Sequence, residues 1–514
     1  MQNNSEIYLY NKSIKKDYDY KMWFFFPGCE AFALSSLGYL WLFKTIDERE
    51  DIEIERVYSD SKTTNIMRNE ISLIGISNSF DMDFLEIFKF LEKNNYEFRA
   101  KDRKDSDPMI FAGGPVITAN PEPYKEIYDF MIIGDGEDVN TQVIEICKDN
   151  QDKPKQEILE LLSKVEGVYV PSVNQSIVRK ITKKLSQCIY TPILSEKSFF
   201  PNTFILEVER GCANRCGFCL ASYINLPLRF VPYEKIIEAI DLGLTKTNKI
   251  ALLGAQLTAH PKFEEICKYI GDKIDNGENI EMSVSSLRVD SFKPEIVNTL
   301  VKAGQKNLTL ALEAGSERLR RVINKNLTEP QIYQAIDVAI ECGLKGMKFY
   351  GILGLPTETD EDVQEIIELS KRIKKRHKQF DISFGFSTFV PKAHTPFQWC
   401  GRTSDKILEK RIQYLTKGLK KIGVKINVSS LKWDYIQAVL SRGDENLTEY
   451  LIESYKNGGK TGAFKKAAKL LKIDTDHYAT ENYDPMAELP WDKISMRPEK
   501  EFLIKEHAGL LSRE

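Results

Sequence analysis

The chain has 514 residues, of which 42% are hydrophobic and 29% charged, and its formal net charge is −3. This length predicts two to four domains with sizeable cores. A net charge near zero argues against a strongly electrostatic nucleic-acid binder. The segment Met1–Glu6 lacks the features of a signal peptide. Nine cysteines without a pairing pattern favour a reducing compartment, so we expect a cytoplasmic protein.

The apolar stretch from Trp23 to Phe43 is long enough to span a bilayer. Pro27, Gly28 and Glu30 interrupt it, however. A buried strand followed by a helix fits this pattern better, so we expect no membrane span.

Residues 1–150 alternate between short apolar runs and helical patterns. Helices are expected at 31–46 and 83–91, and strands at 22–26, 52–58, 71–77, 108–112 and 130–133. This alternation predicts a parallel sheet of Rossmann type. Ligands of such sheets bind at the carboxyl ends of the strands. The small or polar residues expected at these ends, which permit close approach of a ligand, are Ser77, Gly113, Gly114, Gly134 and Gly136.

The pattern weakens over residues 151–197, a linker in which 167–171 and 176–181 look like a hairpin. A second alternating series fills residues 198–399. Its strands are expected at 204–208, 249–253, 281–285, 307–311, 346–350 and 383–389. Six β/α units suit a partial barrel, and residues 400–514 form a mainly helical C-terminal region. We interpret the basic runs at 371–378, 417–425 and 465–472 as solvated helix faces, with an anionic or RNA substrate as the alternative.

Three cysteines, Cys212, Cys216 and Cys219, stand within eight residues in the loop after the first barrel strand. Barrel enzymes place catalytic groups in such loops. An iron–sulfur cubane usually takes four thiolates, so three leave one iron open for another ligand, as in catalytic metal sites. Zinc binding, redox thiols and ordinary core cysteines are the alternatives. Zinc prefers four ligands, often as two close pairs, and the other six cysteines are scattered singly.

This cysteine spacing, with Phe218 directly before the last cysteine, is the signature of the radical S-adenosylmethionine (radical SAM) superfamily. The resemblance covers most of the chain. Residues 1–150 resemble the cobalamin-binding-type domain that precedes many radical SAM barrels, at 113–115, 120–123, 129 and 134–137. The barrel resembles the same class at 285–288, 313–318, 354–358 and 389–392. Residues 394–399, 441–444 and 489–492 look like an uncharacterised subgroup of it.

The resemblance implies a role for each matching residue. Cys212, Cys216 and Cys219 would hold a [4Fe–4S] cluster whose open iron binds SAM. The other residues would contact SAM. Phe218 and the segment from Gly354 to Pro356 would lie near its adenine, and Gly254 and Gln256 would meet its amino group. Ser285 and Glu313 would face the ribose or methionyl end, and Arg318 could pair with the carboxylate. An ordinary buried polar group or helix cap is the alternative for each.

The segment Gly254-Ala255-Gln256 departs from the family, which usually has Gly-Gly-Glu there. Gln256 can still accept a hydrogen bond through its carbonyl, and backbone carbonyls can contribute. The departure therefore weakens this one assignment.

The sequence does not decide whether the protein binds cobalamin. The mutase-type signature Asp-x-His-x-x-Gly is absent, and no histidine precedes His260, so no imidazole of the N-terminal domain could ligate cobalt. Radical SAM relatives often bind cobalamin without a protein imidazole, whereas others keep the fold and lose the cofactor. The glycine-rich strand ends are equally what tight turns need.

The resemblance implies an enzyme that takes an electron from a donor such as flavodoxin or ferredoxin and cleaves SAM to a 5′-deoxyadenosyl radical. Our leading hypothesis is cobalamin-dependent C-methylation of an unactivated carbon. One alternative is rearrangement, dehydrogenation or C–C bond formation without cobalamin. Sulfur insertion is less favoured, because methylthiotransferases carry extra cysteines and this N-terminal domain has only Cys29 and Cys147. A non-catalytic iron–sulfur protein is the last alternative, and the sequence does not identify the substrate.

Overall fold

The computed structural model describes residues 6–12, 18–285 and 287–513. Residues 1–5, where we expect no signal peptide, lie outside the described residues. Ser286, which belongs to the family-like segment 285–288, also lies outside them. Among the described residues, no helix combines the length and the apolar character that a membrane span requires.

The N-terminal domain contains the predicted Rossmann-like parallel sheet, with strands in the order β3-β2-β4-β5-β6-β7. The five parallel strands are β2 (Lys21–Phe26), β3 (Glu53–Tyr58), β4 (Leu73–Ser77), β5 (Met109–Gly113) and β6 (Phe130–Ile132). Side chains alternate between the two faces of a strand, and both faces of β2 are buried. Near-continuous apolar runs are typical of such covered parallel strands.

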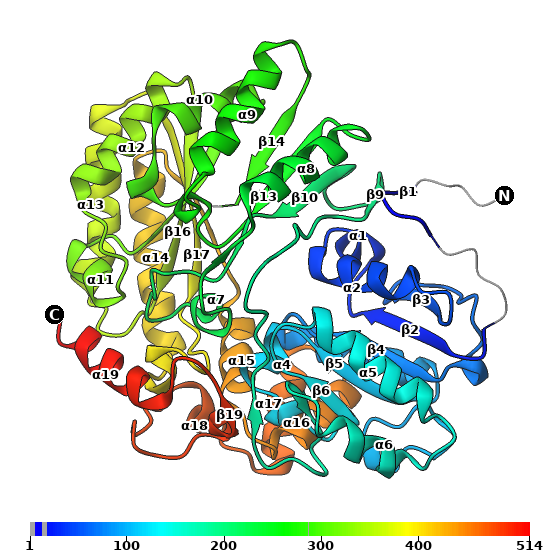
Figure 1. The fold of residues 1–514 in the computed structure, drawn as a ribbon. Helices are drawn as coiled ribbons and strands as arrows, with labels where there is room; N and C mark the ends of the chain where they lie inside the picture. Colours follow the sequence, from blue (N-terminus) through cyan, green and yellow to red (C-terminus); the bar gives the residue numbers. More distant parts are fainter. Residues whose placement is uncertain (1–5, 13–17, 286, 514) are drawn as a thin grey trace.

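Different helices cover the two faces of this sheet (Figure 1). Met22 and Phe24 pack with α2 (Leu37–Asp47), α5 (Glu137–Asp149) and α6 (Lys155–Leu162). Trp23 and Phe25 pack with α3 (Phe84–Lys93) and with C-terminal helices. The helix predicted over 31–46 is broken in the structure: α1 (Glu30–Ala33) ends before Ser35, whose hydroxyl donates to the Ala31 carbonyl at 2.9 Å, and α2 starts at Leu37.

The hairpin predicted in the linker is wrong. β7 (Val168–Tyr169) extends the N-terminal sheet by pairing antiparallel with β6, and β8 (Ile177–Val178) pairs with β19 (Ile494–Ser495). Both strands use partners outside the linker, and the partner of β8 is more than 300 residues away. A local pattern cannot reveal such a pairing.

The second series of strands forms an α/β unit with two parallel sheets. The first contains β10 (Thr203–Glu207), β13 (Lys249–Leu253) and β14 (Glu281–Val284). The second contains β15 (Asn307–Glu313), β16 (Gly346–Leu353), β17 (Asp381–Thr388) and β18 (Lys425–Val428). A bridge between Leu287 and Leu310 joins the sheets. β18 is a seventh strand, short and beyond the six that the sequence predicts.

Helices cover the outer face of this curved sheet (Figure 1). The covering helices are α8 (Tyr233–Leu244), α9 (Phe263–Asp275), α10 (Pro294–Lys302), α12 (Glu329–Glu341), α13 (Asp360–Arg376) and α14 (Asp405–Lys421). On β16, Met347 and Phe349 are buried beneath the helices, whereas Lys348 and Tyr350 are exposed. The inner face of β16 is therefore accessible to solvent.

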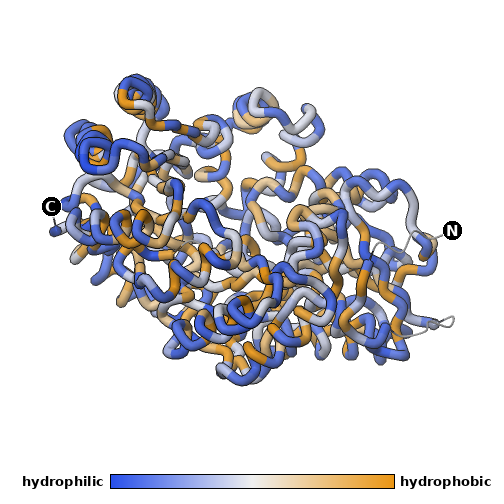
Figure 2. Tube along the Cα trace, turned by 90° about the horizontal axis from the view of Figure 1, so that it is seen from above, coloured by the Kyte–Doolittle hydropathy of each residue, from blue (hydrophilic) through white to orange (hydrophobic). Residues whose placement is uncertain are grey.

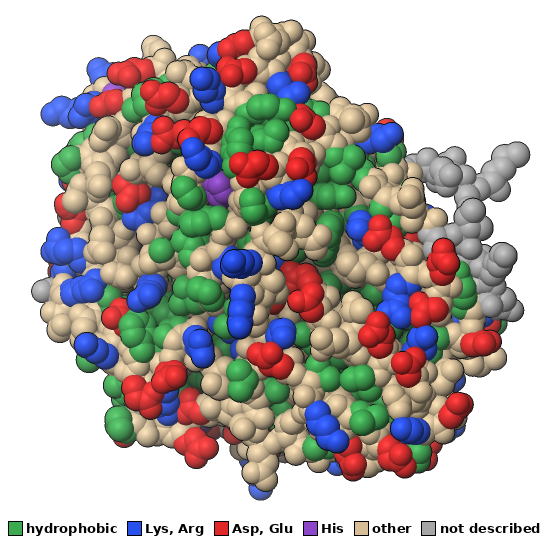
Figure 3. All heavy atoms as spheres, viewed as in Figure 1, with side chains coloured by type: hydrophobic (Ala, Val, Ile, Leu, Met, Phe, Trp, Pro, Cys, Tyr) green, Lys and Arg blue, Asp and Glu red, His purple; other side chains and the backbone are tan. Residues whose placement is uncertain are grey.

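The C-terminal region joins the two domains. α15 (Leu431–Ser441), α16 (Leu447–Lys456), α17 (Thr461–Leu471) and α18 (Thr475–Ala479) share a core with the N-terminal sheet. α19 (Lys500–Leu511) lies beside α11 (Glu317–Val322) of the barrel (Figure 1). Apolar segments run through the middle of the molecule (Figure 2). Acidic and basic side chains are interspersed on the face shown in Figure 3, as the small net charge leads one to expect.

Candidate active site

The three cysteines predicted as cluster ligands lie in one loop between β11 (Glu209–Arg210) and α7 (Leu220–Ile224). Cys212 and Cys216 are buried and Cys219 is half-buried. Gly211 turns the chain with φ of +96° at the start of this loop; a Cβ atom there would lie 2.7 Å from the Asn225 carbonyl oxygen. The loop therefore places all three cysteines on one short segment, with two of them shielded from solvent.

In the described part of the chain, no three His, Cys, Asp or Glu side chains converge on one metal-ion position. A [4Fe–4S] cluster needs no such convergence, because each cysteine binds a different iron atom. Burial raises the pKa of Cys216 to about 12, and the cationic Lys325 and Arg288 act against this effect. Both cations favour the thiolate, the form that binds metal.

Two of the predicted SAM segments meet the cysteine loop. The Gln256 side-chain carbonyl accepts a hydrogen bond from Asn214 Nδ2 at 2.6 Å and lies 3.9 Å from Cys212 Sγ. Ser285 Oγ donates to the Gly254 carbonyl at 2.7 Å. The structure thus brings Gly254, Gln256 and Ser285 together beside the first cysteine.

Glu313 lies at the end of β15 in a left-handed backbone conformation, with φ of +67°. Such a conformation costs energy in a residue other than glycine and is common at functional sites. Burial raises the pKa of its carboxyl, and Lys325, with Nζ at 3.3 Å, opposes that shift. Arg288 donates to the Lys325 carbonyl at 3.1 Å. These cations beside the cysteine loop were not predicted as site residues.

Arg318, predicted at the SAM carboxylate, has partners within the protein. Its guanidinium forms an ion pair with Asp362 and donates to the Thr357 carbonyl at 2.8 Å. Arg318 therefore holds the turn after Gly354 and Pro356, and its contact with the SAM carboxylate stays a prediction. Gly354 has φ of +77° and donates its N–H to Glu358 Oε2 at 2.7 Å. Phe218 packs half-buried in the apolar cluster that contains Leu355.

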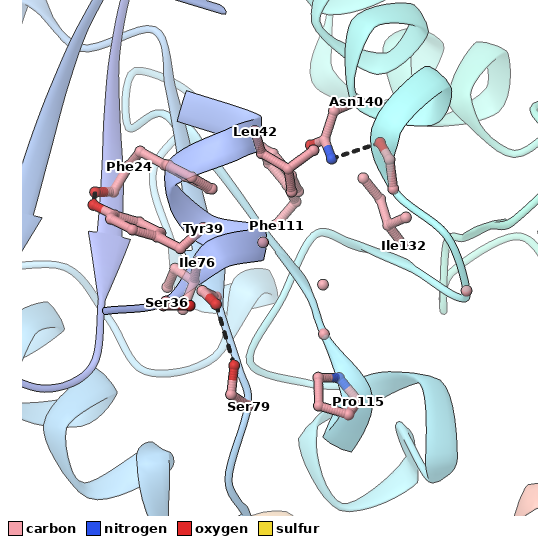
Figure 4. Close-up of a pocket in the computed structure, with 16 residues that line it drawn as sticks. Phe24, Ser36, Tyr39, Leu42, Ile76, Ser79, Phe111, Pro115, Ile132 and Asn140 are labelled. Atoms are coloured by element: carbon pink, nitrogen blue, oxygen red, sulfur yellow. Dashed lines mark hydrogen bonds between the residues drawn. The ribbon is translucent and has the colours of Figure 1, made fainter. Parts of the chain in front are cut away.

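A cavity of about 290 Å³ lies at the carboxyl ends of the N-terminal strands (Figure 4). It is lined by all five residues predicted there, namely Ser77, Gly113, Gly114, Gly134 and Gly136. Its apolar walls come from Phe24, Tyr39, Leu42, Ile76, Phe111 and Ile132. Apolar walls with a few polar groups are typical of small-molecule sites.

A second cavity of about 470 Å³ continues from the first toward the barrel. The two share Gly38, Leu42, Gly114, Pro115, Gly134 and Gly136. The second also touches Glu207, Arg210 and Leu253, at and just beyond the ends of β10 and β13. The two cavities therefore adjoin along these shared residues, and together they reach from the N-terminal sheet to the strand ends near the cysteine loop.

An ion network closes the seam between the two domains beside this space. Arg210 contacts Asp135 at 3.0 Å and Glu137 at 2.5 Å, both from the N-terminal domain, and Glu207 at 2.8 Å. Arg229 contacts the other Asp135 oxygen at 2.5 Å. Burial opposes ionisation of Asp135, but the two arginines outweigh it and hold the pKa of its carboxyl below the usual range.

Glu209 is a site residue that the sequence reasoning missed. Its side chain is buried, and its Oε1 accepts a hydrogen bond from the Gln256 backbone N–H. Burial raises its carboxyl pKa to about 7. In the sequence, only its position directly before Arg210 and the cysteine loop could have pointed to it.

Family models match two parts of the chain: one described as radical SAM proteins, N-terminal, over residues 38–171, and one for the radical SAM superfamily over 206–370. An uncharacterised protein of Methanocaldococcus jannaschii, MJ0966, is 35% identical over 398 residues, which cover 75% of this chain and 83% of that protein. The threonylcarbamoyladenosine tRNA methylthiotransferase MtaB of Aquifex aeolicus is 24% identical over 52% of this chain and 64% of its own length.

Two solved structures share the fold at low identity. The radical SAM methyltransferase TsrM from Kitasatospora setae, with cobalamin and a [4Fe–4S] cluster bound, has a TM-score of 0.50 at 12% identity and covers 71% of this chain and 74% of its own. The cobalamin-dependent SAM radical enzyme OxsB has a TM-score of 0.53 at 13% identity and covers 96% of this chain and 83% of its own. With the cysteine loop and the two matching family models, these similarities show that the chain belongs to the radical SAM superfamily, whose enzymes use a [4Fe–4S] cluster, SAM and an electron donor.

Proposed function

We propose that this protein is a cobalamin-dependent radical SAM methyltransferase that acts on an unactivated carbon. The observation that supports the proposal most is the pair of adjoining cavities between the N-terminal sheet and the barrel strand ends near the cysteine loop. A corrinoid in this space would face both the radical source and a substrate in the open barrel. The cobalamin named for TsrM and OxsB, which share the fold, supports the same assignment.

The residues around the first cavity suit cobalamin. Among the described residues that line it, none is charged. Its apolar walls suit a flat aromatic base, and Ser36, Ser77, Ser79 and Asn140 can bond to hydroxyl and amide groups. No histidine of the described chain lines either cavity, so cobalamin would be held without a protein imidazole on cobalt.

We assign the cluster to Cys212, Cys216 and Cys219, and SAM to the segments around Gln256, Ser285 and Glu313. When bound, the cluster supplies the electron that cleaves SAM, and cobalamin supplies a transferable methyl group. The protein's contribution is to orient these groups and to limit access of water. The exposed inner-face side chains of Tyr350 and Ser387 offer a substrate an aromatic surface and a hydroxyl.

Sulfur insertion, the activity in the name of the MtaB relative, has less support. The N-terminal domain contains two cysteines, Cys29 and Cys147. Cys147 is buried in the core between the sheet and α5, so it is poorly placed to ligate a second cluster.

A cavity-filling variant tests the proposal. Gly38 is the second residue of α2 and lines both cavities, and a Cβ atom there would meet nothing within 4 Å. Gly38→Leu should fill the space and abolish retention of corrinoid after anaerobic purification with cobalamin and gel filtration. Gly462→Leu is the matched control, because Gly462 is also the second residue of a helix with nothing within 4 Å of a Cβ.

The wild-type protein and the control should keep a corrinoid absorption band and form S-adenosylhomocysteine together with 5′-deoxyadenosine under dithionite. A wild-type protein that forms 5′-deoxyadenosine but retains no corrinoid would contradict the proposal. That result would favour rearrangement, dehydrogenation or C–C bond formation without cobalamin.

A further inference from the structure

Residues from four neighbouring strands form one row across the second barrel sheet. Thr309 of β15 stands in register with Lys348 of β16. Lys348 stands in register with Ser383 of β17, which in turn is level with Lys425 of β18. The residues before and after each of the four belong to the core beneath the outer helices. Because side chains alternate between the two faces of a strand, the whole row lies on the inner face.

The two lysines of this row lack an acidic partner. Lys348 and Lys425 are exposed, and no carboxylate in the described part of the chain forms an ion pair with either of them. Asp381 starts β17 on the same face but makes no such pair. Glu313, at the end of β15, is already paired with Lys325 at 3.3 Å. The row therefore carries a net positive charge toward the inside of the barrel.

The arm of Lys348 leans across β17, toward Lys425. A Cβ atom at Gly385 would lie 3.3 Å from Lys348 Cε, so the glycine leaves the room that this arm occupies. The ammonium lies 4.7 Å from the centre of the Tyr350 ring. Adjacent strands are about 4.8 Å apart, which places the backbones of the two lysines roughly 10 Å from each other. Two lysine arms can span this distance, so both ammonium groups can reach one anion above Ser383.

We propose that this row binds a phosphate monoester group of the substrate. At neutral pH such a group carries a charge near −2 and three acceptor oxygens. Two ammonium groups match that charge, and the hydroxyls of Thr309 and Ser383 can donate to the oxygens. A singly charged carboxylate would leave one lysine uncompensated. The inference rests on the proposed function, since it takes the inner face of the barrel as the substrate site, and it names the substrate class as a phosphorylated small molecule.

The position of the row also sets the shape of such a substrate. Lys348 stands six residues before Gly354, which belongs to a predicted SAM segment. A strand rises by about 3.3 Å per residue, so the phosphate would lie on the order of 20 Å from that segment. The phosphate would thus be remote from the methylated carbon and would serve to orient an elongated molecule.

An anaerobic 31P NMR titration tests the assignment on protein with its cluster reconstituted, with phenyl phosphate as the probe. Lys348→Met and Lys425→Met each remove a charge and keep a long side chain. Each should raise the dissociation constant of phenyl phosphate by about tenfold, as expected for one charge-assisted bond. Methyl phenyl phosphate, a diester with a single charge, should bind the wild type about tenfold more weakly than the monoester, because it compensates only one lysine.

Lys469→Met is the control, at an exposed lysine of α17, and should leave both constants unchanged. An equal loss in this control would show unspecific attraction by surface charge and would contradict the proposal. Equal binding of monoester and diester would also contradict it and would favour an RNA backbone. Absence of binding to the wild type, or unchanged binding in both Lys348→Met and Lys425→Met, would overturn it.

A change at Ser383 gives an independent test if a lysine variant does not fold. Ser383→Asp places a carboxylate between the two lysines and should abolish binding of phenyl phosphate. Ser383→Asn is neutral, similar in size and still a donor, so its dissociation constant should stay within about threefold of the wild type. Equal binding by these two variants would overturn the proposal. These titrations contain neither SAM nor cobalamin, so a failure of corrinoid retention leaves their result intact, and the reverse also holds.

Discussion

A Cβ atom at Gly217 would lie 2.9 Å from Cδ1 of Leu510, so the C-terminal helix α19 packs directly against the cysteine loop. Arg513, just after that helix, donates to Asn324 Oδ1 at 2.8 Å. Asn324 in turn donates to the Asn214 carbonyl of the loop at 2.9 Å. The last residues of the described chain thus belong to the wall of the candidate active site.

Leu510→Ala should weaken this wall. Leu510 is fully buried, so truncation should lower the free energy of unfolding by about 2–5 kcal/mol. The cluster should also bleach faster in air, which is followed by its visible absorbance. Leu470→Ala, at a leucine of α17 that is 63% exposed, should change stability by less than about 0.5 kcal/mol and leave bleaching unaltered. Equal bleaching in both variants would contradict the covering role of α19.

Asn324→Gly should loosen the cysteine loop without straining the backbone. Asn324 has φ of +59°, which glycine adopts freely, so the variant removes mainly the side-chain bonds. Each lost bond is worth about 1 kcal/mol, and iron and sulfide per chain should fall after gel filtration. Asn326→Gly is the control, because Asn326 has φ of +51° and is exposed. Full iron content in Asn324→Gly would show that the loop does not need this support.

Asp135→Asn should destabilise the seam between the domains at neutral pH. The change leaves Arg210 and Arg229 without their shared carboxylate, which costs about 3 kcal/mol for a buried pair. Because the folded-state pKa of Asp135 is lowered, its contribution is complete above the ordinary aspartate pKa and is lost as the pH falls through the lower folded value. Urea unfolding should therefore show a gap between wild type and variant that narrows below about pH 4.

Asp275→Asn is the control variant for this pH experiment. Asp275 is exposed and pairs with Lys302 at 2.7 Å, so its loss should cost less than about 1 kcal/mol. A gap between wild type and Asp135→Asn that stays constant from pH 7 to pH 3 would mean that the ion network contributes nothing through its charge.

The pattern of apolar residues predicted the first residue of most strands to within two positions. This was possible because the pattern lies within the sequence of the strand itself. The strand expected at 249–253 is β13 without change. The pairing of Ile177 with Ile494 was missed because the partner is distant in sequence. The same limit applied in the site, because no local pattern reveals the ion pair between Arg318 and Asp362 of α13. Glu209 was missed because its burial and its unpaired oxygen exist only after folding.

The side chain of Arg210 contacts both domains of the molecule. It borders the larger cavity, bonds to Asp135 across the domain seam and stands two residues before Cys212. A molecule that enters the cavity and shifts Arg210 also shifts the backbone that carries the first cysteine. Linkage is reciprocal, so filling the cavity and loading the cysteine loop should change each other's affinity by the same factor. The order in which the protein acquires its cofactors would then alter the rate of assembly but not the final state.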